Sequence, residues 1–411
     1  VAGRFGNSGQ TDYSAANDLL CKLTTSFRNW RPETKGIAID WTAWGSIGMA
    51  TRGSIPKIME MAGIGMLPPE SGIPTVRREL VAGSFNGEIV VAGTLGVMVE
   101  ELDETGGLDI DKVNAALASQ NLLMVGKVKA AKLYGGLEVE TTLDPNEQAF
   151  LYDHAMDGTP LLPGVMGTET FAELATVLTA PGYSVAAIED EQFHSPFKFY
   201  RMEPQTLVLN ATAVPAQGDS LIVQTTLRSI RELAKPGLAP QEKVHFTANV
   251  RLVPTNLPQP NIDFTPPADS ELSIVADDIY KIYFHGPAYK VLERAQVDGN
   301  KAIGKMPVDL PPNSDPADAT SLIAPRLVEL CFQTAGVWEI KTKGVMALPM
   351  ALHSVTAYRQ EAEANGKVLY AVVTAVDDGR QYNAQVVDED GNVYVMLAGY
   401  RTVQLPGKVT L

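Results

Sequence analysis

Strand-like alternation of apolar and polar residues fills most of the chain after residue 127, and only two strongly apolar segments there are long enough for helices. The first helix is predicted from about Pro163 to Leu178. The strands predicted after it lie within residues 197–200, 206–214, 220–230 and 242–253. The second helix is predicted to begin near Pro325, because proline is favoured as a first helical residue. The strands predicted after it lie within residues 350–360, 368–377, 380–391 and 393–403.

The two helices and their strands share one order of elements, in units of roughly 125 residues. This order predicts a duplicated α+β fold in which a sheet wraps each helix, although no sequence repeat is evident. The stretch "PTNLPQPNIDFTPPADS" is too rich in proline for a helix or a central strand, so it is predicted to be an extended linker. The predicted divisions are an N-terminal block 1–108, a linker 109–126, a first unit 127–253, the proline-rich linker 254–270 and a second unit 271–411.

Composition narrows the class of protein. The chain has 411 residues, of which 45% are hydrophobic and 20% charged, a balance that supports several globular cores. The formal net charge of −15 argues against sequence-independent binding to nucleic acid and against binding to anionic membranes. No apolar run reaches the ~20 residues of a membrane-spanning helix. Cys21 and Cys331 lie in apolar, helix-like contexts, which predicts buried reduced thiols in a cytoplasmic protein and neither a disulfide framework nor a metal cluster.

The strongest chemical motif is "DHAMDGTPLLPG", which places His154, Gly158, Pro163 and Gly164 just before the first predicted helix. The start of a helix carries free backbone N–H groups and the positive end of its dipole, so a carbonyl oxygen bound there would be polarised. A neutral imidazole nearby could then remove a proton next to that carbonyl. A lone histidine is more often a partly buried turn residue, but the glycine and proline spacing favours the functional interpretation.

An acid is needed to complete an elimination, and the second helix carries a candidate. Glu329 and Gln333 lie four residues apart in "APRLVELCFQTAGVW", hence on one helix face, among apolar neighbours. The bland alternative is a carboxylate at the rim of the core. We expect the apolar neighbours to raise the pKa of Glu329, so that it can act as an acid near pH 7. Glu169, on the first helix, is the alternative acid.

A second turn also contains potential site residues. In "YFHGPAY", His285 precedes Gly286 and Pro287, with Tyr289 just beyond. This turn could line a substrate channel, or it could be ordinary turn chemistry with packed aromatic rings, and the sequence leaves both open. The remaining histidines have strand-like contexts without recurrent spacing, and a structural role is predicted for them. These are His194, His245 and His353.

Taken in order, these three motifs resemble the dehydratase domains of polyketide and polyunsaturated fatty acid synthases, over about residues 127–411. The resemblance implies a double hotdog fold, two units that each wrap a central helix in an antiparallel sheet. It further implies that His154 removes the α-proton of a 3-hydroxyacyl thioester and that Glu329, supported by Gln333, protonates or orients the departing hydroxyl. The chain departs from the commonest family pattern by having glutamate in place of aspartate and His285 where tyrosine is frequent.

The N-terminal block resembles the C-terminal half of a ketoreductase domain from the same synthases, on the segments "GRFGNSGQTDYSAANDLL" and "AIDWTAWGSIGMATRG". The resemblance implies that Tyr13 would donate a proton to a ketone and that Asn17 would support the relay. The glycine-rich turn that holds NADPH phosphates would lie upstream of this chain. We therefore expect a piece of a longer, Rossmann-like domain, with NADPH bound only when the other half is present.

The predicted function is dehydration of a 3-hydroxyacyl thioester, carried on the phosphopantetheine of an acyl carrier protein, to a 2-enoyl thioester. No metal or organic cofactor is expected for this elimination. The expected partners are the carrier protein and other synthase domains, and a homodimer is left open; neither nucleic acid nor a membrane is expected. Hotdog folds also hydrolyse thioesters or serve as non-catalytic scaffolds, so a thioesterase and an acyl-binding scaffold remain alternatives.

Overall fold

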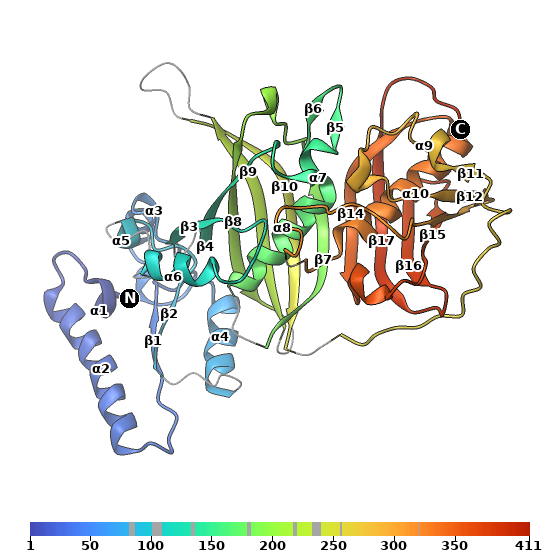
Figure 1. Cartoon of the computed structure of the whole chain (residues 1–411). Helices are drawn as coiled ribbons and strands as arrows, with labels where there is room; N and C mark the ends of the chain where they lie inside the picture. Colours follow the sequence, from blue (N-terminus) through green and yellow to red (C-terminus); the bar gives the residue numbers. More distant parts are fainter. Residues whose placement is uncertain are drawn as a thin grey trace. The chain divides into compact units, whose positions relative to one another are not determined.

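The computed structural model describes residues 1–81, 87–100, 109–132, 136–178, 182–216, 220–231, 240–254, 257–319 and 321–411. The chain forms two compact units, Val1–Gly106 and Gly107–Leu411 (Figure 1). Residues 101–108, at the predicted end of the N-terminal block, lie outside the described residues.

The N-terminal unit contains a small parallel sheet. Strands β1 (Ala38–Trp41) and β2 (Glu88–Val91) pair in parallel, and helices lie between them in the sequence, as in a β-α-β crossover. The helices of this unit are α1 (Ala2–Phe5), α2 (Thr11–Trp30), η1 (Met49–Thr51), α3 (Ile55–Met61), α4 (Pro69–Val81) and α5 (Val97–Glu100). A parallel strand pair joined through helices fits the predicted Rossmann-like α/β segment.

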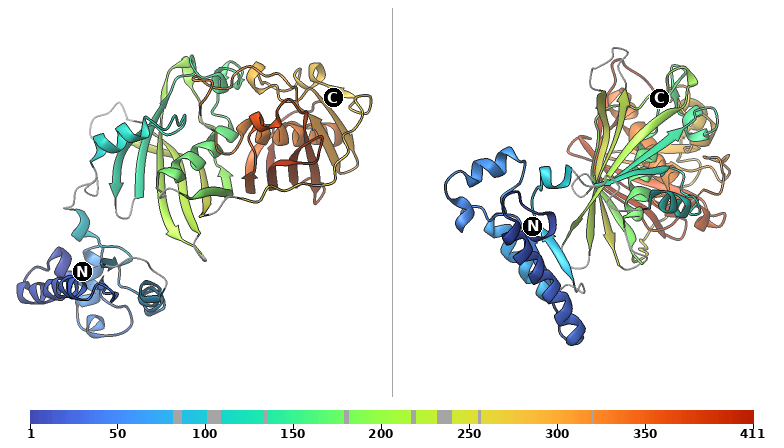
Figure 2. Two further views of the ribbon diagram at one scale, coloured as in Figure 1. Left: turned by 60° about the horizontal axis from the view of Figure 1, so that its bottom comes forward. Right: turned by 90° about the vertical axis from the view of Figure 1, so that its left-hand side faces the viewer.

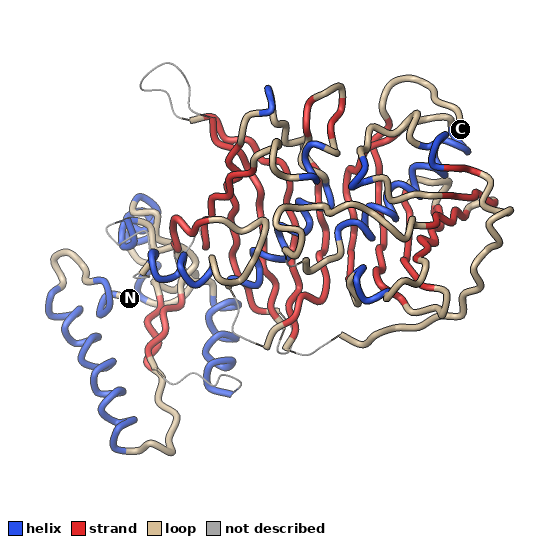
Figure 3. The backbone as a smooth tube through the Cα atoms, viewed as in Figure 1, coloured by secondary structure: helices blue, strands red, loops and turns tan. Residues whose placement is uncertain are grey.

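The second unit is built around one continuous sheet of thirteen strands, in which the second hotdog follows the first (Figure 3). The first hotdog contributes β3 (Lys127–Lys132), β4 (Gly136–Leu143), β7 (Ser184–Phe193), β8 (Gln205–Pro215), β9 (Leu221–Arg231) and β10 (Gln241–Val253). The second contributes β11 (Ile274–Val275), β12 (Arg294–Asp298), β13 (Lys301–Lys305), β14 (Ala347–Ala357), β15 (Leu369–Val376), β16 (Gln381–Asp388) and β17 (Val393–Gln404). Antiparallel pairing of β7 with β14 joins the two halves.

Each half wraps its sheet around one helix, α8 (Gly164–Val177) or α10 (Pro325–Lys343) (Figures 1 and 2). All residues of α8 from Val165 to Ala175 are buried, including the two glutamates Glu169 and Glu173. Helix α10 begins at its proline and ends at Gly344, whose left-handed backbone (φ 68°) suits glycine. The predicted double hotdog fold and both helix starts are therefore confirmed.

Short elements connect these parts. They are α6 (Ile110–Leu117), α7 (Ala149–Tyr152), the hairpin β5 (Ala155–Met156) and β6 (Thr159–Pro160), η2 (Tyr200–Met202), α9 (Ala276–Ile279), η3 (Pro287–Tyr289) and η4 (Glu361–Ala364). The strand expected at 197–200 is wrong: this segment makes a single bridge, between Lys198 and Leu161. It is held instead by Phe197 and Phe199, which are buried in the core.

The proline-rich segment follows the surface of the second hotdog. Its described residues form neither helix nor strand, as expected, but Asn261 bridges to Asn392 of the sheet. Ile262 and Phe264 pack on a small apolar cluster that includes Tyr370. The segment therefore contributes to the packing of the second hotdog as well as connecting the two halves.

Candidate active site

A cavity of about 240 Å³ lies between the two hotdogs and takes its lining from both. The first hotdog supplies the histidine loop, the start of α8 and the end of β7; the second supplies α10, the segment after α9 and the start of β14. Polar lining residues include His154, His194, His285, Glu329, Gln333 and Glu339. The fold thus brings both predicted catalytic residues, His154 and Glu329, to one cavity, although 175 positions separate them in the sequence.

His154 is held in the tautomer that can accept a proton at Nε2. Its Nδ1–H donates to the carbonyl oxygen of Leu161 at 2.9 Å, which fixes the tautomer and leaves Nε2 without a proton. Burial, followed by the charge of His285, lowers the pKa of His154 to about 4, against the opposing charge of Glu329. The imidazole is therefore neutral at pH 7, as removal of a proton requires.

The hairpin between His154 and α8 explains the glycine in the motif. Asp157 and Gly158 both have positive φ, 51° and 75°, as a tight two-residue hairpin turn requires. Gly158 is exposed and does not line the cavity. It therefore contributes to the hairpin turn and does not contact the expected position of the substrate carbonyl. Gly164 does line the cavity, at the first turn of α8, and Pro163 is the residue that caps this helix.

The His285 turn is attached to the His154 loop by backbone pairing. His154 and His285 form an antiparallel bridge, with ring centroids 5.3 Å apart. Asp153 completes the attachment: its carbonyl oxygen accepts from Gly286 N at 2.6 Å, and its carboxylate accepts from Ala288 N at 2.8 Å. The sequence indicated nothing special about Asp153 beyond its place next to His154, because its partners lie more than 130 positions away.

Gly286 is required by this close approach. A Cβ atom there would lie 2.3 Å from the Asp153 carboxylate. Of the remaining turn residues, Pro287 begins η3 and Tyr289 is fully buried, with its ring centroid 5.9 Å from that of His154. Neither of these two residues lines the cavity, so both pack behind the residues that do.

Glu329 is buried and accepts two hydrogen bonds through one oxygen. His285 Nε2 lies 3.2 Å from Glu329 Oε1, and Gln333 Nε2 donates to the same oxygen at 2.9 Å. Burial alone would raise the pKa of Glu329. The hydrogen bond and charge of His285, the charge of His154 and the Gln333 hydrogen bond outweigh burial, so the pKa lies below its ordinary value. The expectation of a raised pKa is wrong, because it counted the apolar neighbours but not the two histidines.

Gln333 is itself fixed by a network that the sequence did not predict. Its Nε2 also donates to Tyr289 O at 2.9 Å, and its Oε1 accepts from the Tyr280 hydroxyl at 2.8 Å. The Tyr280 hydroxyl in turn accepts from Leu292 N at 2.8 Å. These contacts leave Gln333 one orientation, in which its amide N–H group faces Glu329.

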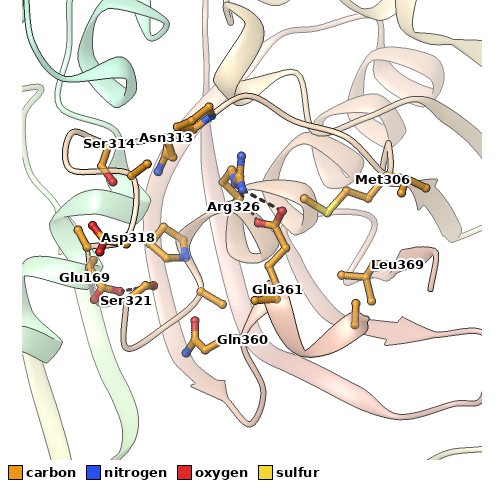
Figure 4. A pocket seen from close by; sticks show the side chains of 18 of the residues that line it. Glu169, Met306, Asn313, Ser314, Asp318, Ser321, Arg326, Gln360, Glu361 and Leu369 are labelled. Carbon is orange, nitrogen blue, oxygen red and sulfur yellow. Dashed lines mark hydrogen bonds and ion pairs between the residues drawn. The ribbon is translucent and has the colours of Figure 1, made fainter. Parts of the chain in front are cut away.

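Glu169 has a different environment. Its carboxylate accepts from Leu322 N at 2.7 Å and Ile323 N at 2.9 Å, in the loop that leads into α10. It lines a separate cavity of about 620 Å³, shown in Figure 4, and does not line the His154 cavity. Burial raises the pKa of Glu169 to about 7, against the lowering effect of these N–H groups and Ser321.

Each cavity is lined by residues from both central helices, α8 and α10. Glu169 and Glu173 stand 160 positions before Glu329 and Gln333, on the corresponding helices. Glu173 is tied to the backbone like Glu169: it accepts from the N–H groups of Leu123, Met124 and Val125. Among the described lining residues, the smaller cavity has both histidines and carboxylates, whereas the larger one has carboxylates without a histidine.

The other histidines fall into two groups. His245 is buried between Ser229 and Ser195, and His353 pairs with Asp190 at the surface, which agrees with structural roles. His194 is exposed and contacts Thr247 at 3.0 Å, but it also lines the cavity. His194 directly follows β7, the strand that pairs with β14. Sequence spacing alone could not predict that this position lies at the cavity.

In the N-terminal unit, Tyr13 and Asn17 lie one turn apart on α2, as expected. The Asn17 amide donates to the Tyr13 carbonyl oxygen at 2.8 Å, and the Tyr13 side chain is 54% exposed. Cys21 is buried there and lies near Asp40 and Glu88, a grouping of possible metal ligands that no sequence spacing predicted. Burial, followed by the Asp40 charge, raises the pKa of Cys21, which keeps the thiol protonated and works against metal binding.

Comparison with known proteins agrees with this geometry. Residues 266–410 match the family model described as "PS-DH: Polyketide synthase dehydratase N-terminal domain"; they contain the second hotdog and Glu329. The dehydratase domain from the CurF module of curacin polyketide synthase superposes with a TM-score of 0.55 at 19% identity, covering 69% of this chain and 98% of that chain. A trans-AT polyketide synthase dehydratase domain from Brevibacillus brevis gives 0.54 at 17% identity, covering 69% and 98%. The second unit therefore has the double hotdog fold of polyketide synthase dehydratase domains.

A curated relative extends the similarity to the N-terminal unit. This relative, a polyunsaturated fatty acid synthase polypeptide of Thraustochytrium sp., is 26% identical over 408 residues, which is 96% of this chain. The chain spans only 13% of the length of that relative. None of the helices in the described part of the chain is long and apolar enough to cross a membrane.

Proposed function

We propose that the second unit dehydrates 3-hydroxyacyl thioesters to 2-enoyl thioesters. The observation that carries this proposal is the shared cavity, in which a neutral histidine with a free Nε2 faces a buried carboxylate and a second histidine. Removal of a C2 proton and loss of the C3 hydroxyl require one base and one acid on the same ligand. The geometry supplies both from opposite halves of the fold.

In the proposed reaction, the thioester carbonyl oxygen lies at the first turn of α8, beside Gly164, where backbone N–H groups and the helix dipole stabilise developing negative charge. His154 Nε2 takes the proton from C2. The electron pair of the broken C–H bond forms the C2–C3 double bond as the C3–O bond breaks. The departing oxygen takes one proton and leaves as water, and the proton on His154 then returns to the acid.

We further propose that the acid is the His285–Glu329 pair and not Glu329 alone. The lowered pKa of Glu329 favours its carboxylate, and His285 Nε2 donates to this carboxylate across 3.2 Å. Nδ1 of His285 is buried and has no hydrogen-bond partner among the described residues, and a substrate hydroxyl would supply one. Glu329 then holds His285 in place through this contact, and Gln333 keeps the carboxylate in place.

Related structures support the choice of residue types. One inactive variant of the CurK dehydratase has a histidine replaced by phenylalanine, and another has an aspartate replaced by asparagine. In the present chain, His154 and Glu329 are the histidine and carboxylate that face one cavity. The similarity to a polyunsaturated fatty acid synthase further supports an acyl carrier protein and neighbouring synthase domains as partners, with the substrate on phosphopantetheine. A ketoreductase origin for the N-terminal unit remains part of this proposal.

The test is turnover of a 3-hydroxyacyl N-acetylcysteamine thioester, with products separated by mass. Dehydration gives the enoyl thioester and water; a thioesterase would release the free 3-hydroxy acid, and a scaffold would release neither. His154→Ala should remove enoyl formation, while His353→Ala, in a surface ion pair, should keep it. Free acid as the main product, unaffected by His154→Ala, would contradict the proposal.

A further inference from the structure

The His154 cavity continues well beyond the reacting centre, along one face of α10. Glu329, Phe332, Gln333, Gly336 and Glu339 all line it, at the i, i+3, i+4, i+7 and i+10 positions of a single helix face. At ~1.5 Å per residue, the ten positions from Glu329 to Glu339 advance ~15 Å. A linear ligand can therefore contact the catalytic centre and Glu339 at once.

Gly336 allows the Tyr283 side chain to approach this face of α10 closely. A Cβ atom at this position would lie 2.3 Å from the Tyr283 hydroxyl oxygen, which donates to Gln333 O at 2.9 Å. Glycine in the middle of a helix lowers helix stability relative to alanine. Its presence halfway along the cavity indicates that room at this point matters more than helix propensity.

Glu339 is a buried carboxyl group with one oxygen unused. It is 1% exposed, and Thr402 Oγ1 donates to its Oε1 at 2.9 Å. Its Oε2 has no hydrogen-bond partner among the described residues. The Tyr382 side chain also interacts with this carboxyl group by a weaker hydrogen bond that lowers its pKa, while the Tyr382 hydroxyl donates to the Gly379 carbonyl oxygen at 3.3 Å. A buried polar atom left in this state is unfavourable and indicates a missing partner.

We propose, on the basis of the dehydratase function above, that Glu339 hydrogen-bonds a polar group of the ligand about three helical turns from the reacting carbons. The ligand class is a linear acyl thioester that presents a hydroxyl, carbonyl or amide group there. With bonds of ~1.5 Å in a zigzag chain, roughly a dozen atoms span this distance. Glu339 is thus a specificity-determining residue, because a ligand without such a group leaves its Oε2 unpaired.

Two parts of a carrier-bound substrate have this chemistry: an oxygenated acyl chain, and the amide and hydroxyl groups of the pantetheine arm. Burial raises the pKa of Glu339, against the lowering effects of Thr402, Tyr382 and Lys343. A protonated carboxyl group can donate as well as accept, so it can pair with either source. The experiment must therefore separate the two sources.

Binding is measured on the full chain carrying His154→Ala, so that no probe is turned over. The three probes are a 3-hydroxydodecanoyl N-acetylcysteamine thioester, the same compound with a second hydroxyl at the far end of the chain, and 3-hydroxydodecanoyl pantetheine. We expect at least one functionalised probe to bind ~3–10-fold more tightly than the plain probe. A gain for the hydroxylated probe assigns the acyl chain, and a gain for the pantetheine probe assigns the arm.

Glu339→Leu should remove that gain and leave the plain probe unchanged, while Glu339→Gln, which still offers donor and acceptor atoms, should keep part of it. If Glu339→Leu fails to give a cooperative thermal melt, Glu339→Met replaces it. Glu191→Gln is the matched control, because Glu191 is also fully buried but does not line the cavity. Equal affinities for all three probes, or equal losses for all three in Glu339→Leu, would overturn the inference. Because these are binding measurements, the inference can fail while the unmodified chain still forms enoyl product, or hold when it does not.

Discussion

Glu191 gives the most quantitative prediction from the structure. This glutamate, on β7, is fully buried, and its only hydrogen bonds in the described part of the chain come from Thr168 Oγ1, at 3.1 and 2.9 Å. Burial raises its pKa from 4.5 to about 8, against the effect of Thr168. We predict that Glu191→Gln, which keeps the size and an acceptor for Thr168, removes a pH dependence of stability that the unmodified chain shows.

The direction follows from proton linkage. A carboxyl group whose pKa is raised on folding contributes its stability fully below the unfolded pKa of 4.5 and loses it as the pH rises through about 8. At ~1.4 kcal/mol for each tenfold change, the full loss is at most ~5 kcal/mol, and relaxation around the ionised group reduces it to about 2–5 kcal/mol. Glu169, Glu173 and Glu339 have raised pKa values in both proteins, so the difference between the two proteins isolates Glu191.

The assay is urea unfolding between pH 4.5 and pH 8.5, in a background where Trp30, Trp41 and Trp44 are phenylalanine. Trp338 then reports on the second unit alone. The free energy of unfolding of the unmodified protein should fall relative to that of Glu191→Gln as the pH rises. Glu203→Gln, at an exposed position, should show no such trend. A difference between the unmodified protein and Glu191→Gln that stays constant across this range would refute the reasoning, because Glu191 would then ionise alike in both states.

Three further outcomes follow from the structure. The acidic limb of kcat/KM should lie near pH 4, because His154 has a pKa of about 4 and acts only when neutral; a limb near pH 6.5 would contradict its burial. Gly336→Ala should lower stability by about 1–3 kcal/mol despite better helix propensity, since its Cβ meets Tyr283, and thermal unfolding would measure this. NADPH titration, followed by fluorescence, should show no saturable binding to this chain; stoichiometric binding would contradict this prediction.

Local pattern and motif order predicted the fold well. The apolar helices and alternating strands of the second unit have periodicities that sequence alone reveals, and the helix starts at Pro163 and Pro325 follow from proline chemistry. The segment at 197–200 misled because Phe197 and Phe199 alternate like a strand, although their rings pack in the core without a neighbouring strand. Alternation reports which side of a segment is buried, and it does not report backbone pairing.

The site was predictable in its members and less so in its electrostatics. His154, Glu329 and Gln333 belong to short motifs whose residue spacing can be recognised in the sequence. The contact between His285 and Glu329, in contrast, joins a turn to a helix 44 positions later. That contact reverses the expected direction of the Glu329 pKa. Asp153 and Tyr280 were missed for the same reason, because each acts through hydrogen bonds to segments distant in the sequence.

The assignment of Glu329 over Glu169 can be tested directly, because the duplicated fold puts them at corresponding positions with different partners. The backbone N–H groups of Leu322 and Ile323 donate hydrogen bonds to the Glu169 carboxylate. Side chains of His285 and Gln333 contact the Glu329 carboxylate instead, and Glu329 lines the His154 cavity. Glu329→Gln should lower kcat by ~10²–10⁴-fold with little change in KM, as expected for loss of a positioned acid–base group.

Glu169→Gln should act on stability instead. The amide keeps one acceptor oxygen but turns an NH₂ group towards a backbone N–H, which costs about 1–3 kcal/mol of unfolding free energy. Its kcat should remain within a few-fold of the unmodified value, because Glu169 does not line the His154 cavity. Steady-state kinetics and urea unfolding of both variants separate these effects. If Glu169→Gln were the variant that loses turnover while Glu329→Gln kept it, the larger cavity would be the catalytic one. The tie between Glu169 and the loop before α10 would then have to open during catalysis.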